Sequence, residues 1–175
     1  MAITPAALTT AGLNTAATQY AVASVTPTAN SLVLLWVFNT SGASQAPSSV
    51  TGNNLTWVQV ATLNNADGFR NCTLLRAMGA SPTTDQPLIN FSSQASRAIW
   101  SLIEYSGTDT SGTNGSGAIV QSVTGGVNPG TSLSITLAAF GSANNMAVAG
   151  MGINNASGIT KGSTYTETGA ATITL

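Results

Sequence analysis

The side chains that could perform acid–base or metal chemistry are few in this sequence. It has 175 residues, with five Asp or Glu, four Lys or Arg and no histidine. The ionisable side chains are Arg70, Arg76, Arg97, Lys161, Asp67, Asp85, Glu104, Asp109 and Glu167, with Cys72, Tyr20, Tyr105 and Tyr165. Histidine is the commonest general base and metal ligand near neutral pH. The composition therefore predicts a protein that is not an enzyme and has no catalytic, cofactor-binding or metal-binding residues.

Glu104 is the carboxylate that the pattern places on a buried face. In the strand expected over residues 97–105 it shares a face with Trp100. A buried carboxylate must be neutral or paired. A neutral one could serve as a glycosidase-type acid, but no second carboxylate has an arguable place beside it. Arg76 points the same way as Leu74 on the strand expected over residues 70–78, so we predict a structural ion pair between Arg76 and Glu104.

Two other features could bind metal or react. Residues 109–116 offer oxygen ligands at alternate positions, as in a calcium loop, but with one Asp and no Glu we interpret them as a flexible loop. Cys72 is the single cysteine, which excludes an intrachain disulfide. Its apolar surroundings indicate a small core residue. The alternative is a reactive thiol, with Arg70 and Arg76 as the nearby cations.

Aromatic residues could form a platform for stacking on a sugar ring. Trp36 and Trp100 lie within apolar runs and are expected in the core. Trp57 follows the polar pair Asn53-Asn54, so it is the best candidate for a glycan contact. Core packing is the favoured interpretation for Trp57 as well, since aromatic side chains dominate β-sheet cores.

Charge and hydropathy exclude several classes of partner. The net charge is −1 and 43% of the residues are hydrophobic, which is typical of a folded chain rather than a disordered one. The scattered basic residues give no patch for nucleic acid, and no basic amphipathic helix is present for a membrane surface. The N-terminus lacks a positive region followed by an apolar run, so no classical export signal is expected.

Short β-branched and aromatic runs, separated by Gly, Ser, Asn and Pro clusters, predict an all-β fold. The expected strands, about ten, are 19–26, 31–39, 56–63, 70–78, 88–92, 97–105, 118–124, 132–140 and 145–153, with 165–167 and 171–175 closing the sheet. Residues 56–63 and 70–78 are expected to form a hairpin, because Asp67-Gly68 supplies the positive φ that its turn needs. Residues 106–117 have no apolar side chain and are expected to be a solvent loop, and residues 5–10 are the only, short, helical candidate. We predict an antiparallel β-sandwich or jelly roll with no significant helix.

The expected organisation is a single β-sandwich domain over residues 19–175, preceded by an N-terminal arm or first edge strand over residues 1–18. Strand edges without charge or proline pair readily with other chains. The termini are therefore candidates for contacts between subunits, while pairing within the subunit is the favoured alternative. The candidate assembly residues are Ile3, Pro5, Leu8, Leu13, Ile173 and Leu175.

Several stretches resemble a widespread, poorly characterised β-sandwich domain of bacteriophage structural proteins and bacterial surface proteins. They are ITPAALTTAGLNTAATQY, NNLTWVQVAT, AMGASP, WSLIEYSGTDTSGTNGSGAIVQS and SLSITLAAFGSANN, which together extend over residues 3–152. The resemblance implies a β-sandwich fold and a context in a bacteriophage particle or on a bacterial surface. The family offers no catalytic residues that could be transferred to this chain.

These observations lead to an expected function. The chain is expected to be a virion structural protein, a phage capsid decoration or cement protein that forms a homotrimer or larger assembly and binds the major capsid protein. It would be made in the host cytoplasm and reside on the virion surface, without cofactor, nucleic acid or membrane. One alternative is a carbohydrate-binding or adhesive module that uses Trp57 and the loops at 40–54 and 106–117. Another is a self-assembling extracellular filament subunit.

Overall fold

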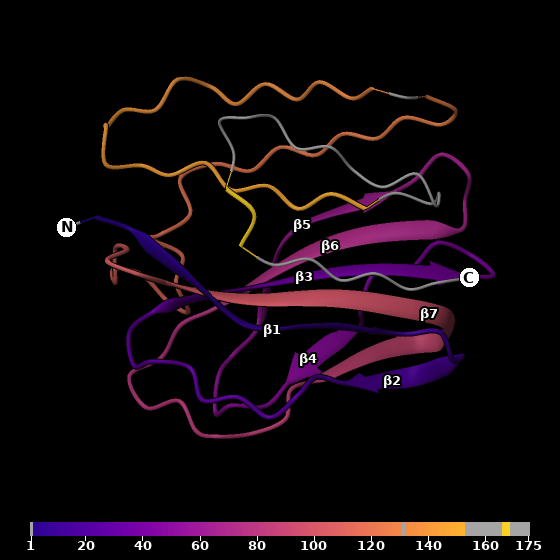
Figure 1. Ribbon diagram of the computed structural model, residues 1–175, viewed down its shortest axis with the longest axis horizontal. Coiled ribbons are helices and arrows are strands. Elements are labelled where there is room, and N and C mark those ends of the chain that lie inside the picture. Colours follow the sequence, from indigo (N-terminus) through magenta and orange to yellow (C-terminus); the bar gives the residue numbers. More distant parts are fainter. Residues whose placement is uncertain (1, 131, 153–165, 169–175) are drawn as a thin grey trace.

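The computed structural model describes residues 2–130, 132–152 and 166–168, and these form an all-β structure (Figure 1). Seven strands make one antiparallel sheet, and no helix occurs in this part of the chain. The strands are β1 (Thr4–Leu13), β2 (Ala17–Ala21), β3 (Leu32–Ser41), β4 (Ser49–Thr51), β5 (Val58–Asn64), β6 (Arg70–Ala77) and β7 (Leu88–Ser106). The all-β, antiparallel character predicted from the sequence is confirmed.

Strand β7 organises the sheet because it pairs with four other strands. Its first part pairs with β2 and β4, which both place a residue opposite Ile89. Its second part pairs with β1 and β3, and the strand order across the main sheet is β1-β7-β3-β6-β5. The polar, exposed residues 92–94 lie between the two parts, where β7 curves back on itself (Figure 1). This bend places β2 and β4 against one face of the main sheet.

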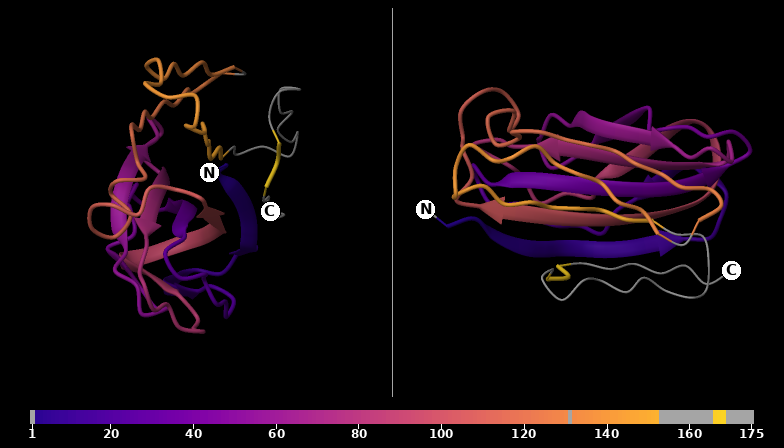
Figure 2. Two further views of the ribbon diagram at one scale, coloured as in Figure 1. Left: turned by 90° about the vertical axis from the view of Figure 1, so that its left-hand side faces the viewer. Right: turned by 90° about the horizontal axis from the view of Figure 1, so that it is seen from above.

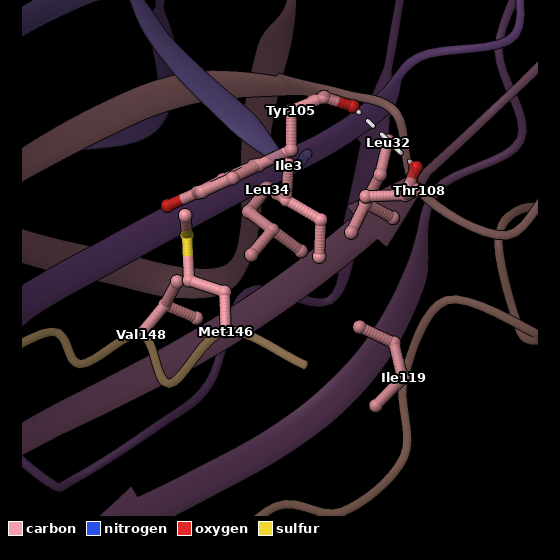
Figure 3. A pocket seen from close by; sticks show the side chains of 8 residues that line it. All are labelled: Ile3, Leu32, Leu34, Tyr105, Thr108, Ile119, Met146 and Val148. Carbon is pink, nitrogen blue, oxygen red and sulfur yellow. Dashed lines mark hydrogen bonds between the residues drawn. The ribbon is translucent and has the colours of Figure 1, made fainter. Parts of the chain in front are cut away.

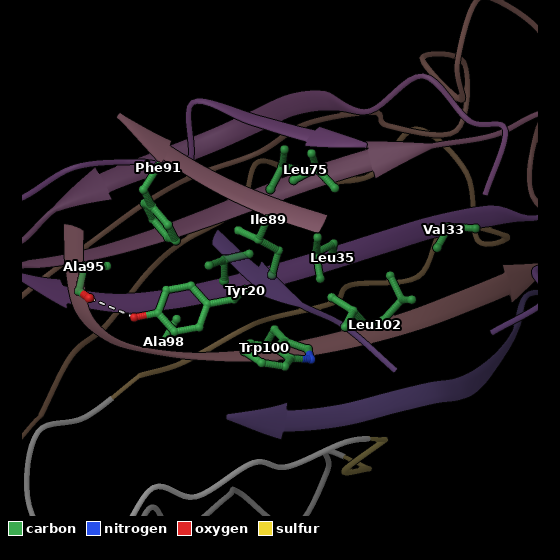
Figure 4. Close-up of a cluster of buried hydrophobic side chains, with 13 residues drawn as sticks. Tyr20, Val33, Leu35, Leu75, Ile89, Phe91, Ala95, Ala98, Trp100 and Leu102 are labelled. Carbon is green, nitrogen blue, oxygen red and sulfur yellow. Dashed lines mark hydrogen bonds between the residues drawn. The ribbon is translucent and has the colours of Figure 1, made fainter. Parts of the chain in front are cut away.

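That face, called the inner face here, carries most of the buried side chains (Figure 4). Strand β3 crosses its centre, and the four residues from Leu32 to Leu35 are all buried. The inner-face cluster consists of Tyr20, Val22, Val33, Leu35, Val37, Val50, Leu75, Ile89, Phe91, Ala95, Ala98, Trp100 and Leu102. The Tyr20 hydroxyl lies within hydrogen-bond distance of two carbonyls, those of Ala95 (2.8 Å) and Thr15 (2.9 Å), and donates its single proton to them, so its polar end is satisfied inside the core.

The opposite, outer face of the main sheet carries a smaller buried cluster. It consists of Leu32, Leu34, Leu74, Met78, Ile103 and Tyr105. Successive side chains of a strand point to opposite faces, which is why the unbroken apolar run of β3 serves both clusters. The 31–39 strand predicted from that run is confirmed, with bounds of Leu32–Ser41.

The predicted hairpin between residues 56–63 and 70–78 is also confirmed, as β5 and β6. Asp67 Oδ1 accepts hydrogen bonds from the main-chain amides of Phe69 (2.8 Å) and Arg70 (3.2 Å), and the Arg70 side chain forms an ion pair with Asp67. Gly68 has a φ of 75°, a conformation that favours glycine. The Asp-Gly pair thus fixes the turn through both its carboxylate and its missing Cβ.

Several elements in the first part of the chain differ from those expected. Residues 5–10, the helical candidate, lie within β1, because pairing with β7 outweighs the local preference of Pro and Ala for a helix start. The two strands predicted over 88–92 and 97–105 are one continuous strand. The loop expected at 40–54 contains the short strand β4.

The loop over residues 106–117 is only partly a solvent loop. Gly115 is buried, and a methyl group there would lie 2.9 Å from a Leu32 methyl carbon and 3.2 Å from Met78 Cβ. Arg76 Nη1 donates to the Asn114 carbonyl at 2.9 Å. The loop therefore folds back onto the outer face and ends the compact part of the structure.

The strands predicted over 118–124 and 132–140 are absent, as is the described part of the one predicted over 145–153. Residues 118–130 and 132–152 are extended without being paired into strands. The strands predicted over 165–167 and 171–175 lie mostly outside the described residues, and the described 166–168 form none.

Candidate assembly surface and charged groups

Residues 118–152, called the extended run here, continue from the loop and pass beside the sheet (Figures 1 and 2). Ala118 and Ile119 pack against the outer-face cluster. The run then leaves the sheet and returns, so that Gly150 and Gly152 lie against the rings of Trp36 and Phe38 on β3. It therefore touches the outer face at its two ends.

The extended run exposes large apolar side chains. Of the described residues, all such exposed side chains except Leu13 and Phe69 belong to it, with Val120 at 64% and Met151 at 56%. They are Val120, Val123, Val127, Leu133, Ile135, Phe140, Met146, Val148 and Met151. The run contains no Asp, Glu, Lys or Arg. A large apolar surface without charge marks an interaction site.

Two parts of the run lie side by side in antiparallel orientation. The Gln121 side-chain amide donates to the Ala138 carbonyl (2.9 Å) and its oxygen accepts from the Ala138 amide (3.0 Å). A methyl group on Gly125 would lie 3.0 Å from the Ile135 side chain. No main-chain ladder joins these parts within residues 118–130 and 132–152. Among the described residues, few main-chain groups of the run are hydrogen-bonded, those of Ala138 being an exception, so most are available to another strand.

A small apolar pocket lies between the outer face and the run (Figure 3). It is lined by Ile3, Leu32, Leu34, Tyr105, Thr108, Ile119, Met146 and Val148. Its volume is about 50 Å³, whereas ligand pockets usually enclose roughly 300–1,000 Å³. Burial also raises the pKa of Tyr105, so the phenol stays neutral. The pocket is a gap in apolar packing rather than a site for a small molecule.

The candidate assembly residues of the N-terminal segment lie in or beside β1. This strand pairs with β7 of the same chain from Thr4 to Leu13. Ile3 packs against the outer-face cluster and Leu8 against the inner-face cluster, and Pro5 is half-buried. Leu13, which is 48% exposed, keeps an apolar surface for a partner. Ile173 and Leu175 lie outside the described residues.

The fold covers part of the indole ring of Trp57, the candidate glycan contact. It is half-buried, packs against the inner-face cluster and precedes β5. Its Nε1 donates to the Gly52 carbonyl at 3.4 Å. Only part of the indole surface therefore remains for stacking.

The predicted ion pair between Arg76 and Glu104 was wrong. Arg76 lies opposite Leu34 and Glu104 opposite Val33, and neighbouring residues of β3 point to opposite faces. Glu104 accepts hydrogen bonds from the Thr28 amide (2.9 Å) and hydroxyl (3.1 Å). Arg76 instead binds carbonyls of the 106–117 loop on the outer face.

Cys72 lies on β6 between Phe38 and Leu63 of the neighbouring strands. Burial raises the pKa of its thiol to about 12. Reactive cysteines have a lowered pKa and nearby cations that stabilise the thiolate. The structure favours the interpretation of Cys72 as a packing residue.

In the candidate calcium loop, the single carboxylate binds a main-chain amide of the same loop. Asp109 Oδ1 accepts a hydrogen bond from the Ser111 amide at 2.8 Å, and this bond lowers the pKa of Asp109. Nowhere in the described part of the chain do three His, Cys, Asp or Glu residues gather as metal ligands would. Among the same residues, no helix has the length and apolar character to cross a membrane.

Comparison of the chain with protein-family models, with curated proteins and with solved structures gives no match. What the chain does must therefore be inferred from its own surfaces. Sequence reasoning treated the extended run as part of the closed sheet. The available signal for its different role was the absence of every charged residue from 118 to 152.

Proposed function

We propose that this chain is a non-enzymatic structural subunit that associates with copies of itself and with a partner protein through the extended run. The observation that carries the proposal is the exposure of nearly all its large apolar side chains, from Val120 to Met151. Their burial between subunits would contribute roughly 25 cal/mol for each Å² of apolar surface removed from water. The open main chain would add hydrogen bonds of the kind that form when a strand joins a sheet edge.

The context of this assembly is a virion surface. The resemblance of residues 3–152 to phage structural domains and the small net charge of −1 support a capsid decoration or cement protein, with the major capsid protein as its partner. A nearly neutral surface suits a subunit present in many neighbouring copies, because like charges on those copies would repel. The low number of titratable groups supports a role that is not catalytic.

The fold in this proposal is a β-sandwich or jelly roll. The alternating residues 118–124, 132–140 and 145–152 would supply strands of a second layer over the outer face. The antiparallel arrangement of Gln121 and Ala138 supports this geometry. Partner strands would complete the ladder that the described residues leave open.

The proposal is tested by measuring mass in solution with light scattering over a range of protein concentrations. The wild type is expected to form a trimer or larger species. The double variant Val120→Ser/Ile135→Ser should dissociate at concentrations where the wild type is assembled, since it removes apolar side chains of the run that are exposed in the subunit.

The matched control is Phe69→Ser, which removes an exposed apolar side chain outside the run. It should assemble as the wild type does. A wild type that stays monomeric at high concentration, alone and with the capsid partner, would refute the proposal. So would a control that dissociates as readily as the Val120/Ile135 variant. Deletion of residues 1–18 is unsuitable, because it removes β1 from the sheet.

A further inference from the structure

Two arginines share one end of the outer face. Thr40 on β3 lies opposite Arg70 of β6 on one side and Arg97 of β7 on the other. Residues directly opposite in an antiparallel pair project to the same face. Thr40 alternates in phase with Leu32 and Leu34, so all three side chains belong to the outer face. Two strand spacings separate the Cα atoms of the two arginines by about 10 Å.

Both guanidinium groups have donors without a partner. Nε of Arg70 and Nε of Arg97 are each shielded from solvent and hydrogen-bonded to nothing. Arg70 uses a terminal nitrogen in its ion pair with Asp67, whereas Arg97 has no hydrogen bond or ion pair among the described residues. A shielded donor without an acceptor costs free energy, and more so when it carries charge.

The local charge is also unbalanced. Asp67 is the one described carboxylate that contacts either arginine. Glu104 is bound to Thr28, and Asp85 accepts a hydrogen bond from the Asn53 amide at 3.2 Å. Two guanidinium groups against one carboxylate leave a net positive charge at this end of the outer face. An anion placed there would meet weak screening and strong attraction.

We propose that Arg97 and Arg70, with Thr40 between them, form a binding site for a small oxyanion, a carboxylate or phosphate group. The planar fork of a guanidinium group matches the two oxygens of such an anion. Arg97 is the principal ligand because none of its donors is hydrogen-bonded to another described residue, and Arg70 adds its Nε. The site is separate from the extended run and stands whether or not the chain assembles.

The experiment measures the thermal unfolding midpoint of the full chain while sodium phosphate or sodium acetate replaces sodium chloride at constant ionic strength. We expect a saturable rise in Tm with at least one of the two anions, and the stronger one identifies the preferred chemistry. Arg97→Gln should lose most of this rise. Arg76→Gln, which removes an arginine from the same face but one bound to loop carbonyls, should keep it.

A second measurement does not depend on a variant that folds. The Nε–H resonances of the wild type, followed by NMR during the same titrations, should shift for Arg97 and Arg70 and not for Arg76. The proposal is overturned if neither anion raises Tm beyond chloride, if Arg97→Gln keeps the full rise, or if the Arg97 resonance does not move. Association is not measured in either experiment, so failure here is distinct from failure of the assembly proposal.

Discussion

The sheet over residues 4–106 and the extended run over residues 118–152 are built from similar sequence and end in different states. Both consist of alternating apolar and hydroxyl-bearing residues with few charges. In the sheet, β7 offers a partner to β1, β2, β3 and β4, and the apolar side chains are buried on both faces. In the run, no such partner exists among the described residues, and the apolar side chains face solvent.

The difference shows that alternation specifies a strand only together with a partner. A strand in a sheet pairs its main-chain groups with a neighbouring strand and buries at least one face. The sheet meets these requirements within the chain, since β3 is flanked by β6 and β7. Among the described residues the run pairs with no strand and exposes most of its large apolar side chains, and it lacks the charges that protect natural edges from association. We interpret it as a surface completed by other subunits.

The largest expected contrast between the two regions comes from a matched pair of leucines. Leu35 is fully buried in the inner-face cluster, whereas Leu133 is 41% exposed in the run. Leu35→Ala should lower the free energy of unfolding by about 2–5 kcal/mol. Leu133→Ala should change it by less than about 0.5 kcal/mol. Urea unfolding of both variants at low protein concentration measures the difference. Equal losses would show that the run is packed within the subunit.

A smaller contrast is expected for two asparagines in the turn before β5. The buried Asn53 amide donates to the carbonyls of Val25 (2.9 Å) and Thr83 (2.9 Å), whereas the exposed Asn54 amide donates to Ser81 (3.0 Å). Both have positive φ, 57° and 53°.

Because the two asparagines have similar positive φ angles, the comparison tests mainly the buried hydrogen bonds. Asn53→Ala should cost about 1–3 kcal/mol of unfolding free energy more than Asn54→Ala, since it leaves the Thr83 carbonyl without its donor and removes one of the two donors to the Val25 carbonyl. Thermal unfolding checks this result. If the two variants lose the same stability, Asn53 does not tie the loop to the sheet.

The compact sheet should also show an alkaline dependence through Cys72. Burial raises the pKa of the thiol from 9.0 to about 12. The folded state therefore keeps the proton that the unfolded chain loses, so this stabilisation is full below pH 9.0 and is lost as the pH rises towards 12. The loss of unfolding free energy from this one thiol is at most about 1.4 kcal/mol per pH unit.

The measurement is urea unfolding of the wild type and of Cys72→Ala across alkaline pH. As the pH rises above 9.0, the free energy of unfolding of the wild type should fall relative to that of Cys72→Ala. Tyr20 and Tyr105 have a raised pKa through burial in both proteins, so their contributions cancel in the comparison. Parallel pH profiles would contradict the burial of the thiol.

The smallest expected effect concerns the point where the run touches the sheet. A methyl group on Gly150 would overlap the ring of Trp36, while nothing lies within 4 Å of one on Gly141. Gly150→Ala should alter the unfolding free energy by less than about 1 kcal/mol. It should nevertheless move the Trp36 signal in ¹⁹F NMR of protein labelled with fluorotryptophan. Gly141→Ala should leave that signal in place, and an unmoved signal in both variants would place the run elsewhere.

Sequence reasoning succeeded where local chemistry determines the structure. The apolar run of β3 predicts a central strand because it has to serve both faces. Asp67 and Gly68 predict the β5–β6 turn because a carboxylate acceptor and a positive φ are both required there. Such signals depend on residues close together in the chain.

It failed where the answer depends on register between distant strands. Arg76 and Glu104 were each correctly predicted to lie in strands. Predicting whether they pair also requires the register, that is, which residue of β3 lies opposite each of them. The polar residues 92–94 resemble a break, although β7 continues through them because its ends pair with different strands. Charge absence in the extended run indicates association, but only the structure shows its apolar side chains exposed.

The most direct test of the account is hydrogen exchange of the main-chain amides at low and at high protein concentration. Amides of β3 and β7 should be protected at both, since their ladders form within the chain. Amides of the extended run should exchange rapidly in the dilute monomer and become protected as assemblies form. Protection of the run in a sample whose mass is that of a monomer would contradict the account, because it would show that the chain completes the run by itself.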